Sequence, residues 1–141
     1  MQVGDIMTRA VVSVGEAEPV TAAARLLQRC NCGAVPVCDR SGRLRGIVTD
    51  RDIALRCVAG ELDPAHTPVS EIMSRRVVTV SAAAPVSEAA LRMRSEAVRR
   101  VPVTENDRLV GMLSLGDMAR LRELRGEAGE TLRALSVNLR R

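Results

Sequence analysis

Two short segments of the chain place a hydroxyl and a carboxylate at a spacing that suits the binding of a sugar. Thr49 precedes Asp52 by three residues, and Ser114 precedes Asp117 by the same interval. Each pair follows a short apolar run and precedes a helical pattern, so each is expected where a strand enters a helix. A hydroxyl and a carboxylate there can hydrogen-bond the vicinal hydroxyls of a ribose, and the helix N-terminus attracts a phosphate. The two segments are therefore candidate nucleotide sites.

The same spacing is also typical of a capping box, in which the hydroxyl and the acid each satisfy an unpaired backbone amide. Helix capping alone is thus an alternative interpretation of both segments. Their recurrence does not decide between the two interpretations, because a duplication copies a cap and a site alike.

The elements that position these segments come from an internal duplication. Residues 3–37 match residues 69–103 at 15 of 35 positions, where chance gives about three. One residue is then lost from the second copy, after which the register resumes and pairs Asp52 with Asp117. The chain therefore contains the same unit twice.

Each copy predicts a β-α-β-β-α unit. In the first copy a valine-rich strand at 11–14 precedes a helix that Pro19 opens, with apolar residues at helical spacing. A hairpin of strands and a second helix follow, over 35–38, 44–48 and 50–59. We expect an α+β fold in which the two units form a pseudo-two-fold pair. The expected boundaries are 1–66 for repeat 1, with a linker over 61–68, then 67–119 for repeat 2 and 120–141 for an Arg-rich helical tail.

The composition excludes several classes of function. The chain has no Phe, Tyr or Trp, so it lacks the stacking platforms of single-stranded nucleic-acid binders. Its positive charge is concentrated at the end: residues 1–118 hold 15 Arg against 14 acids, whereas residues 119–141 hold six Arg against three. No apolar run is long enough to cross a membrane, and the N-terminus lacks the order of a signal peptide. We expect a cytoplasmic protein that binds neither nucleic acid nor membranes.

The cysteines are expected to be reduced structural thiols and not metal ligands. Cys30, Cys32 and Cys38 lack the paired C-x2-C spacing of zinc scaffolds, and Cys32 aligns with Val98, an expected core position. Zinc or redox chemistry is the alternative. His66 lies in the linker with no second histidine, so a surface position is expected. No constellation of catalytic side chains supports an enzyme.

The paired pattern I-M-[TS]…V-V-[ST]-V…P-V…A-A…V-P-V…G-[IM]-[VL]-[TS]-x-x-D-[IM] resembles a tandem CBS-domain pair, also called a Bateman module. The resemblance covers about residues 3–119. The stretch GIVTDRDIALRCVAGELDP is especially similar to small stand-alone bacterial CBS-pair proteins, including those of hypoxic and stress responses.

The resemblance implies a non-catalytic regulatory module that binds an adenosine-containing ligand, namely AMP, ADP, ATP or S-adenosylmethionine, with no obligatory cofactor. In that family the [TS]-x-x-D residues hold the ribose, which here implies Thr49, Asp52, Ser114 and Asp117. The base lies in an apolar cleft between the copies. The residues implied for it are Met7, Val11, Val12, Cys32 and Ala34 on one side, with Met73, Val77, Val78 and Val98 on the other.

The two implied sites differ in their basic residues. Arg51 follows Thr49, where the second copy has Gly116, whereas Arg100 stands where the first copy has Ala34. Family members place a phosphate-binding basic residue at the second of these points, so Arg51 and Arg100 are the phosphate candidates. A solvated surface charge is the alternative for each.

The tail and the assembly leave two functional hypotheses. Its apolar residues follow the spacing of a coiled-coil seam, at Leu121, Leu124, Ala128, Leu132, Leu135 and Leu139. The tail is expected to pack on its own module or on a dimer mate, or to dock to a partner protein or an acidic surface. The leading hypothesis is a homodimeric sensor that transmits ligand occupancy to an unidentified partner. The alternative is a ligand-independent dimerisation scaffold that acts through the tail.

Overall fold

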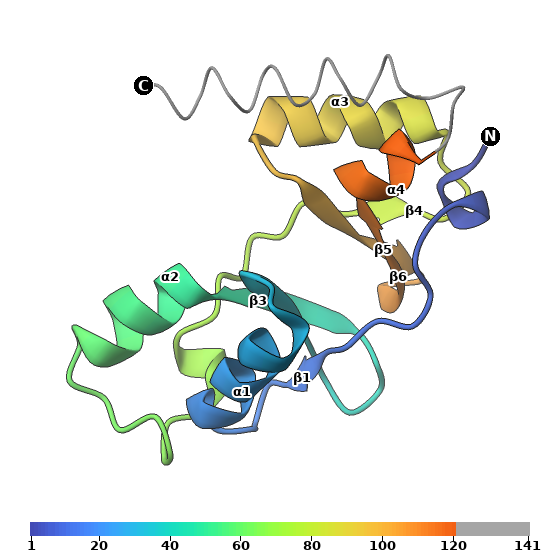
Figure 1. Cartoon of the computed structure of the whole chain (residues 1–141). Coiled ribbons are helices and arrows are strands. Elements are labelled where there is room, and N and C mark those ends of the chain that lie inside the picture. Colours follow the sequence, from blue (N-terminus) through green and yellow to red (C-terminus); the bar gives the residue numbers. More distant parts are fainter. Residues whose placement is uncertain (121–141) are drawn as a thin grey trace. The chain divides into compact units, whose positions relative to one another are not determined.

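The structure of the chain is a computed structural model that describes residues 1–120 (Figure 1). The chain forms two compact units. The first-repeat unit is Val12–Val77, and the second-repeat unit combines Met1–Val11 with residues 78–120 of the described chain. The units therefore differ in extent from the two repeats as they follow one another in the sequence.

The first-repeat unit contains a three-stranded sheet of order β1-β2-β3, with the first pair parallel and the second antiparallel. Pro19 precedes α1. The helix ends before Asn31, whose left-handed backbone conformation is typical of a helix C-terminus. In chain order the elements are β1 (Val14–Gly15), α1 (Val20–Cys30), β2 (Ala34–Cys38), β3 (Leu44–Thr49) and α2 (Asp50–Asp52), which continues as a π-helical segment over Ile53–Val58.

The second-repeat unit contains the same sheet, in the order β4-β5-β6 and with the same strand directions. Its elements are a 3-10 turn (Val3–Asp5), β4 (Val80–Ser81), α3 (Val86–Glu96), β5 (Arg100–Glu105), β6 (Arg108–Ser114) and α4 (Leu115–Ala119). The α+β fold with two repeats is confirmed.

Two elements are shorter or more irregular than the sequence predicts. The strand expected over 11–14 is reduced to β1, because only Val14 and Gly15 pair with β2. The helix expected over 50–59 is α-helical only in its first turn and π-helical after it. The helical tail expected over 120–141 lies outside the described residues, apart from Arg120. Among residues 1–120, no helix is long and apolar enough to cross a membrane.

Each core is aliphatic and includes the first residues of the other repeat. Val3 and Met7, near the chain start, are buried in the core of the second-repeat unit. Val69, Ile72 and Met73, which follow the linker, are buried in the core of the first-repeat unit. Burial of such side chains is the main source of stability in a core without aromatic rings. Each segment is thus part of the fold of the unit in which its side chains are buried.

Backbone bridges fasten these segments to the third strand of each sheet. The amide of Ser74 donates to the carbonyl of Ile47 at 2.8 Å, and the Ile47 amide donates back at 2.9 Å. In the second-repeat unit Thr8 and Met112 exchange the same pair of bonds, both at 2.9 Å. Each segment therefore extends the sheet beyond β3 or β6 by one bridged residue.

Candidate functional site

Thr49 and Asp52 form a complete capping box where β3 passes into α2. The Asp52 amide donates to Thr49 Oγ1 at 3.0 Å, and the Thr49 amide donates to Asp52 Oδ2 at 3.0 Å. Asp52 is 8% exposed, one of three buried polar residues of the described chain. These bonds fix the side chains of both residues at the edge of the sheet.

Ser114 and Asp117 repeat this geometry where β6 passes into α4. The Asp117 amide donates to Ser114 Oγ at 3.1 Å, and the Ser114 amide donates to Asp117 Oδ2 at 2.9 Å. Asp117 is 9% exposed, so the burial of the two carboxylates is nearly equal. The structure thus shows capping at both junctions.

The hairpins bring the residues before V-P-V next to these junctions. Ala34 pairs with Thr49 across β2 and β3, and the Asp50 amide donates to the Gly33 carbonyl at 3.1 Å. In the second-repeat unit Arg100 pairs with Ser114 across β5 and β6. The hairpin ladders thus place a residue that precedes V-P-V beside each junction.

The two candidate phosphate residues are both exposed. Arg100 lies at the start of β5, opposite Ser114. Arg51 lies in the first turn of α2, and its amide donates to the carboxylate of Asp50 at 2.8 Å. Each guanidinium is therefore accessible to an anion close to its junction.

The aliphatic candidates are distributed differently from the sequence-based grouping. Met7 is buried in the second-repeat unit with Val78 and Val98 packed against the same core, whereas Met73 is buried in the first-repeat unit with Cys32. The two methionines have exchanged sides because each lies at the start of one repeat in the sequence and is buried in the unit of the other. Of the remaining candidates, Val12 is exposed, and partial burial is shared by Val11, Ala34 and Val77.

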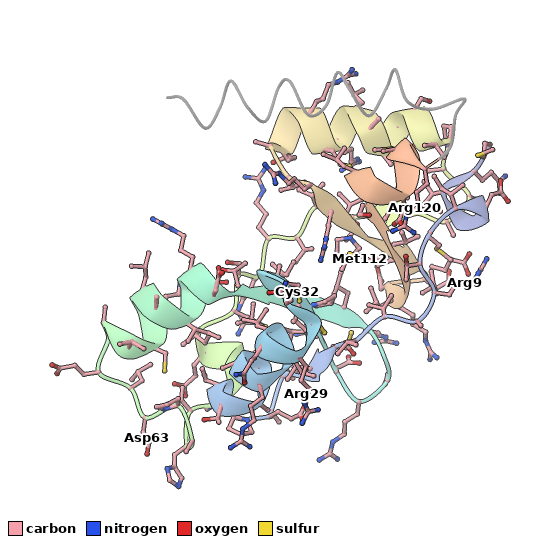
Figure 2. The ribbon with its side chains drawn as sticks, viewed as in Figure 1. Arg9, Arg29, Cys32, Asp63, Met112 and Arg120 are labelled. Atoms are coloured by element: carbon pink, nitrogen blue, oxygen red, sulfur yellow. The ribbon has the colours of Figure 1, made fainter. Side chains whose placement is uncertain are left out.

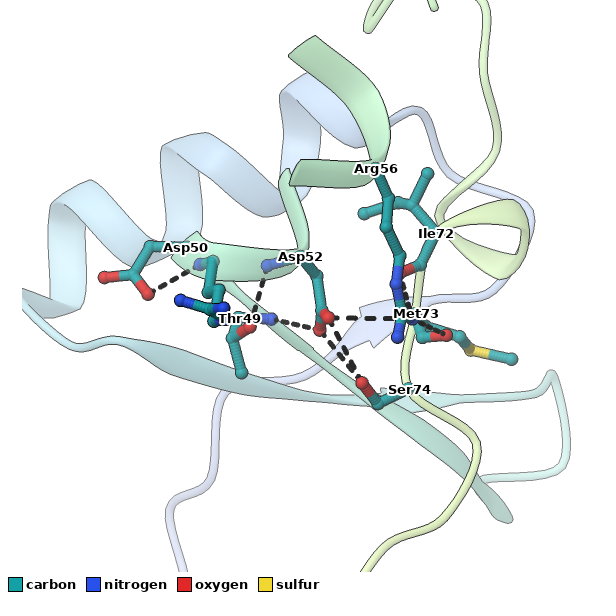
Figure 3. A network of polar contacts seen from close by, with 8 residues as sticks. Thr49, Asp50, Asp52, Arg56, Ile72, Met73 and Ser74 are labelled. Atoms are coloured by element: carbon teal, nitrogen blue, oxygen red, sulfur yellow. Dashed lines mark hydrogen bonds and ion pairs between the residues drawn. The ribbon is translucent and has the colours of Figure 1, made fainter. Parts of the chain in front are cut away.

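Asp52 also makes contacts that the sequence did not suggest (Figure 3). The hydroxyl of Ser74 donates to Asp52 Oδ1 at 3.2 Å and to Oδ2 at 3.3 Å. Arg56 Nη1 lies 3.6 Å from Asp52 Oδ1 and donates to the carbonyls of Ile72 and Met73, both at 3.1 Å. The carboxylate is thus joined to the segment that leads into the second repeat.

A sequence signal for these contacts exists but is weak. Ser74 aligns with Thr8, so a hydroxyl recurs at the same point of each repeat. Arg56 lies four residues after Asp52, a spacing that brings side chains together on a helix. Neither observation by itself distinguishes a partner of Asp52 from a surface residue.

Two stretches of the chain match the family model of the CBS domain, over residues 3–58 and 69–123. The chain belongs to the CBS domain family. The two matches follow the two repeats, and the tandem arrangement that the sequence predicts is confirmed. The model that matches describes a CBS domain and indicates no catalytic family.

The relatives of this CBS pair include small proteins of similar length. Hypoxic response protein 1 of Mycobacterium tuberculosis is 40% identical over 82% of this chain and 81% of its own. The CBS domain-containing protein YhcV of Bacillus subtilis is 38% identical over 95% of this chain and 94% of its own. L-aspartate semialdehyde sulfurtransferase of Methanocaldococcus jannaschii is 30% identical over 84% of this chain, a match that spans only 23% of that enzyme.

Solved structures of other CBS pairs share the fold. Hypoxic Response Protein I, a crystal structure with two coordinated zinc ions, has a TM-score of 0.77 at 38% identity and covers 85% of this chain and 98% of its own. The CBS domain protein PAE2072 from Pyrobaculum aerophilum, complexed with AMP, has a TM-score of 0.75 at 31% identity, covering 92% and 99%. The CBS domain pair of protein MJ0100, with 5-methylthioadenosine and S-adenosyl-L-methionine, has a TM-score of 0.71 at 30% identity, covering 85% and 98%.

The cysteines of this CBS pair form no disulfide. Cys38 and Cys57 are buried, Cys30 is exposed, and Cys32 (labelled in Figure 2) is half-buried. Burial raises the pKa of the Cys38 thiol, a hydrogen bond with Ser13 lowers it, and the charge of Asp39 raises it. Within residues 1–120, no three His, Cys, Asp or Glu side chains are grouped as a metal ion would require.

His66 lies at the surface, as its position in the linker predicts. Its Nδ1 is 2.6 Å from Asp63 Oδ2, and both side chains are exposed (Asp63 is labelled in Figure 2). The hydrogen bond from His66, with a smaller contribution from the Ala65 amide, lowers the pKa of Asp63. This pair lies in the linker, within the first-repeat unit.

Proposed function

We propose that this CBS pair is a non-catalytic regulatory module that binds an adenosine-containing ligand. The observation that carries the proposal is the matched pair of buried carboxylates, Asp52 and Asp117, each bonded to a hydroxyl residue at a strand-to-helix junction. Family members at 31% and 30% identity are complexed with AMP and with S-adenosyl-L-methionine. AMP, ADP, ATP and S-adenosylmethionine share an adenosine, and the ribose is the part that these junctions suit.

The carboxylates are proposed to accept hydrogen bonds from the vicinal ribose hydroxyls. An ionised carboxylate has about four lone-pair positions, so the single capping bond of Asp117 leaves it able to accept more, whereas Asp52 must first give up its bond from Ser74. Thr49 Oγ1 and Ser114 Oγ retain a donor proton, because each only accepts a bond in its capping box. Each junction therefore offers both an acceptor and a donor to a ribose.

Aliphatic side chains and arginines are proposed to hold the rest of the ligand. A flat adenine can be held between aliphatic groups without an aromatic partner, because burial of apolar surface is favourable in itself. Arg51 and Arg100 are exposed and adjacent to the junctions, so either can pair with a phosphate. The residues proposed for the base are Met7, Val11, Val12, Cys32, Ala34, Met73, Val77, Val78 and Val98.

Regulation requires that the ligand favour one arrangement of the protein over another. We propose that the protein acts as a homodimer and transmits occupancy to a protein partner. Similarity to hypoxic response protein 1 supports a role in a stress response. The domain boundaries that best fit this role are those of the repeats, 1–66 and 67–119, with 120–141 available to the partner.

The test is equilibrium dialysis of AMP, ATP and S-adenosylmethionine against the wild type, Asp52→Asn and Asp117→Asn. Because the chain has no Phe, Tyr or Trp, the ultraviolet absorbance of bound adenine is seen almost without protein background. Loss of hydrogen bonds to a charged acceptor should weaken binding about tenfold to a hundredfold at the altered site. No binding at about millimolar concentration, which corresponds to about 4 kcal/mol, would overturn the proposal.

Asp5→Asn is the matched control for these variants. The Gln2 amide donates to Asp5 Oδ2 at 2.9 Å, so Asp5 makes the same kind of capping contact, but it is exposed and has no [TS]-x-x-D pattern. Its replacement should leave every affinity unchanged. Undiminished binding in both Asp52→Asn and Asp117→Asn would show that the ligand binds elsewhere.

A ligand-independent scaffold is the second candidate. The observation in its favour is that both capping boxes are complete without a ligand. It predicts that none of the three compounds binds, and that deletion of 121–141 changes the mass of the assembly in solution. Sedimentation of the full chain and of the deletion variant would measure that change.

A further inference from the structure

The two junctions share their capping geometry but differ in what else holds the carboxylate. We propose that Ser74 and Arg56 form a latch on Asp52, so that a ribose binds at the first junction only when the Ser74 hydroxyl leaves the carboxylate. This inference rests on the proposed function, and it makes the two sites unequal. The junction of Ser114 and Asp117 has no such latch among the described residues and is the stronger site.

The acceptor positions of Asp52 are taken by three neighbours (Figure 3). Oδ2 accepts from the Thr49 amide at 3.0 Å and from the Ser74 hydroxyl at 3.3 Å. Oδ1 accepts from the same hydroxyl at 3.2 Å and lies 3.6 Å from Arg56 Nη1. Two vicinal hydroxyls need a pair of acceptor positions that face the same way. In this geometry the Ser74 hydroxyl bridges both oxygens, so it competes with a ribose for them.

Arg56 keeps the Ser74 hydroxyl in that place. Its Nη1 donates to the carbonyls of Ile72 and Met73, both at 3.1 Å, so one guanidinium joins α2 and its π-helical continuation to the backbone just before Ser74. The bridge of Ser74 to Ile47 fixes the same residue from the other side. The hydroxyl is therefore held against Asp52 by its own backbone, which reduces the entropy lost on forming the bond.

Within residues 1–120, the second junction lacks the contacts that Ser74 and Arg56 make at the first. Thr8 occupies the position of Ser74 and makes the same backbone bridge, to Met112, but its side chain is exposed and makes no hydrogen bond to Asp117 within residues 1–120. Arg56 aligns with Leu121. Asp117 Oδ1 instead lies 3.8 Å from Nη1 of Arg120, a side chain that is 79% exposed. Because the guanidinium of Arg120 is exposed to solvent, an ion pair of this length contributes little and yields readily to a ligand.

Opening the latch has a consequence beyond affinity. Residues Ile72–Ser74 belong to repeat 2 in the sequence but to the first-repeat unit in the structure, so a ribose that displaces Ser74 loosens their attachment to that unit. Occupancy of the first junction is thereby coupled to the position of this segment, because the ligand favours the state in which the segment is released. A regulatory module needs a differential contact of this kind.

The experiment measures AMP binding by calorimetry at one site at a time. In the Asp117→Asn background only the first junction remains, and Ser74→Ala should tighten AMP there about tenfold, since a hydrogen bond to a charged group no longer has to be broken. Arg56→Met keeps an unbranched side chain and should also increase the affinity for AMP. In the Asp52→Asn background the matched variant Thr8→Ala should leave AMP binding unchanged.

The outcomes separate the latch from the proposed function. If AMP binds the wild type but Ser74→Ala weakens it or leaves it unchanged at the first junction, Ser74 supports the ligand or is irrelevant to it, and the latch is wrong. Equal tightening by Thr8→Ala would show that the two junctions are equivalent, which also overturns it. If AMP, ATP and S-adenosylmethionine bind neither the wild type nor any variant, the proposed function fails, and the regulatory role of the latch fails with it.

Amide hydrogen exchange of the protein without ligand tests whether the latch holds the segment around Ser74. Ser74→Ala and Arg56→Met should speed exchange at the Ser74 amide relative to the wild type, because both fasten its segment. Thr8→Ala should not alter exchange at the Thr8 amide, since that side chain holds nothing. Unchanged exchange at Ser74 in both variants would show that the contacts of Asp52 do not hold the segment.

Discussion

The first-repeat and second-repeat units are built from the same β-α-β-β-α pattern, yet they are fastened differently. In each, the third strand of the sheet is extended by a bridge from the start of the other repeat, at Ser74 or at Thr8. Among residues 1–120, side chains add to that bridge only in the first-repeat unit, through Asp52 and Arg56. Duplication has therefore preserved the backbone plan, while the side chains that connect segment and junction have diverged.

Truncation of the two buried methionines should give the largest effects and shows which segment completes which unit. Met7→Ala should destabilise the second-repeat unit, and Met73→Ala the first, because each side chain is buried there at 9% and 4% exposure. Replacing a buried methionine by alanine costs about 2–5 kcal/mol. Urea unfolding followed by circular dichroism would measure the total loss, and hydrogen exchange would locate it.

The location of the loss is the decisive part of that experiment. Met7→Ala should speed exchange most in β5 and β6, although Met7 lies at the start of repeat 1 in the sequence. Faster exchange mainly in β2 and β3 would contradict the assignment of Met1–Val11 to the second-repeat unit. Leu91→Ala is the control, because Leu91 is 56% exposed on α3 and should change the free energy of unfolding by less than about 0.5 kcal/mol.

Alanine at Gly46 or Gly111, the glycines just before the bridged residues of β3 and β6, should have smaller and unequal effects on stability. A Cβ at Gly46 would lie 2.7 Å from the Ser74 carbonyl oxygen, whereas one at Gly111 would lie 3.0 Å from that of Thr8 and 2.5 Å from Met7 Sδ. The Gly46 Cβ would also lie 2.8 Å from Met73 Sδ, but either thioether can rotate away. Both carbonyls are fixed by bonds from Ile47 and Met112, so the shorter backbone contact at Gly46 makes the difference. We expect losses of about 2–3 kcal/mol for Gly46→Ala and about 1–2 kcal/mol for Gly111→Ala.

Chemical denaturation of both glycine variants would check this order. Gly116→Ala is the matched control, because its Cβ would meet nothing closer than Ser114 Oγ at 3.5 Å. It lies within α4, where alanine should raise the free energy of unfolding by about 0.5–1 kcal/mol. Equal losses at Gly46 and Gly111 would mean that the two segments are held with the same rigidity.

The parts of this fold that the sequence predicts are those with a local or repeated signal. The helix over Val20–Cys30 and the hairpin strands follow from apolar spacing, and the paired junctions follow from the alignment of Asp52 with Asp117. Each of these signals lies within a short stretch of sequence or is repeated in the second copy. It can therefore be recognised without knowledge of the long-range packing.

The parts that the sequence does not predict depend on contacts between distant residues. Residues 3–8 and 69–74 are so alike that no local pattern tells which repeat each one packs on, so Met7 and Met73 fit either core. The bond from Ser74 to Asp52 spans 22 residues. The π-helical turns over Ile53–Val58 also escape a search for the period of an α-helix.

The smallest expected difference between the two units is in how their stability responds to alkaline pH. Cys38 is buried in β2, whereas the aligned residue of the second-repeat unit is Thr104, which does not titrate in this range. Burial, with a smaller contribution from Asp39, raises the pKa of Cys38 against the lowering by Ser13. The folded protein thus holds this proton more tightly than the unfolded chain, a stabilisation that is fully present below the ordinary pKa of a thiol.

That stabilisation is lost as the pH rises from the ordinary pKa of a thiol through the raised pKa of Cys38. The chain has no Lys and no Tyr, so neither of these residue types contributes to an alkaline loss of stability. Cys38→Thr copies the residue of the other repeat and keeps Cys57 in place. Denaturation at a series of pH values should show a flatter alkaline decline in this variant than in the wild type, while Cys30→Ser should leave the decline unchanged. An alkaline decline that persists in Cys38→Thr would have its origin outside β2, because Cys38 is the one ionisable side chain of that strand.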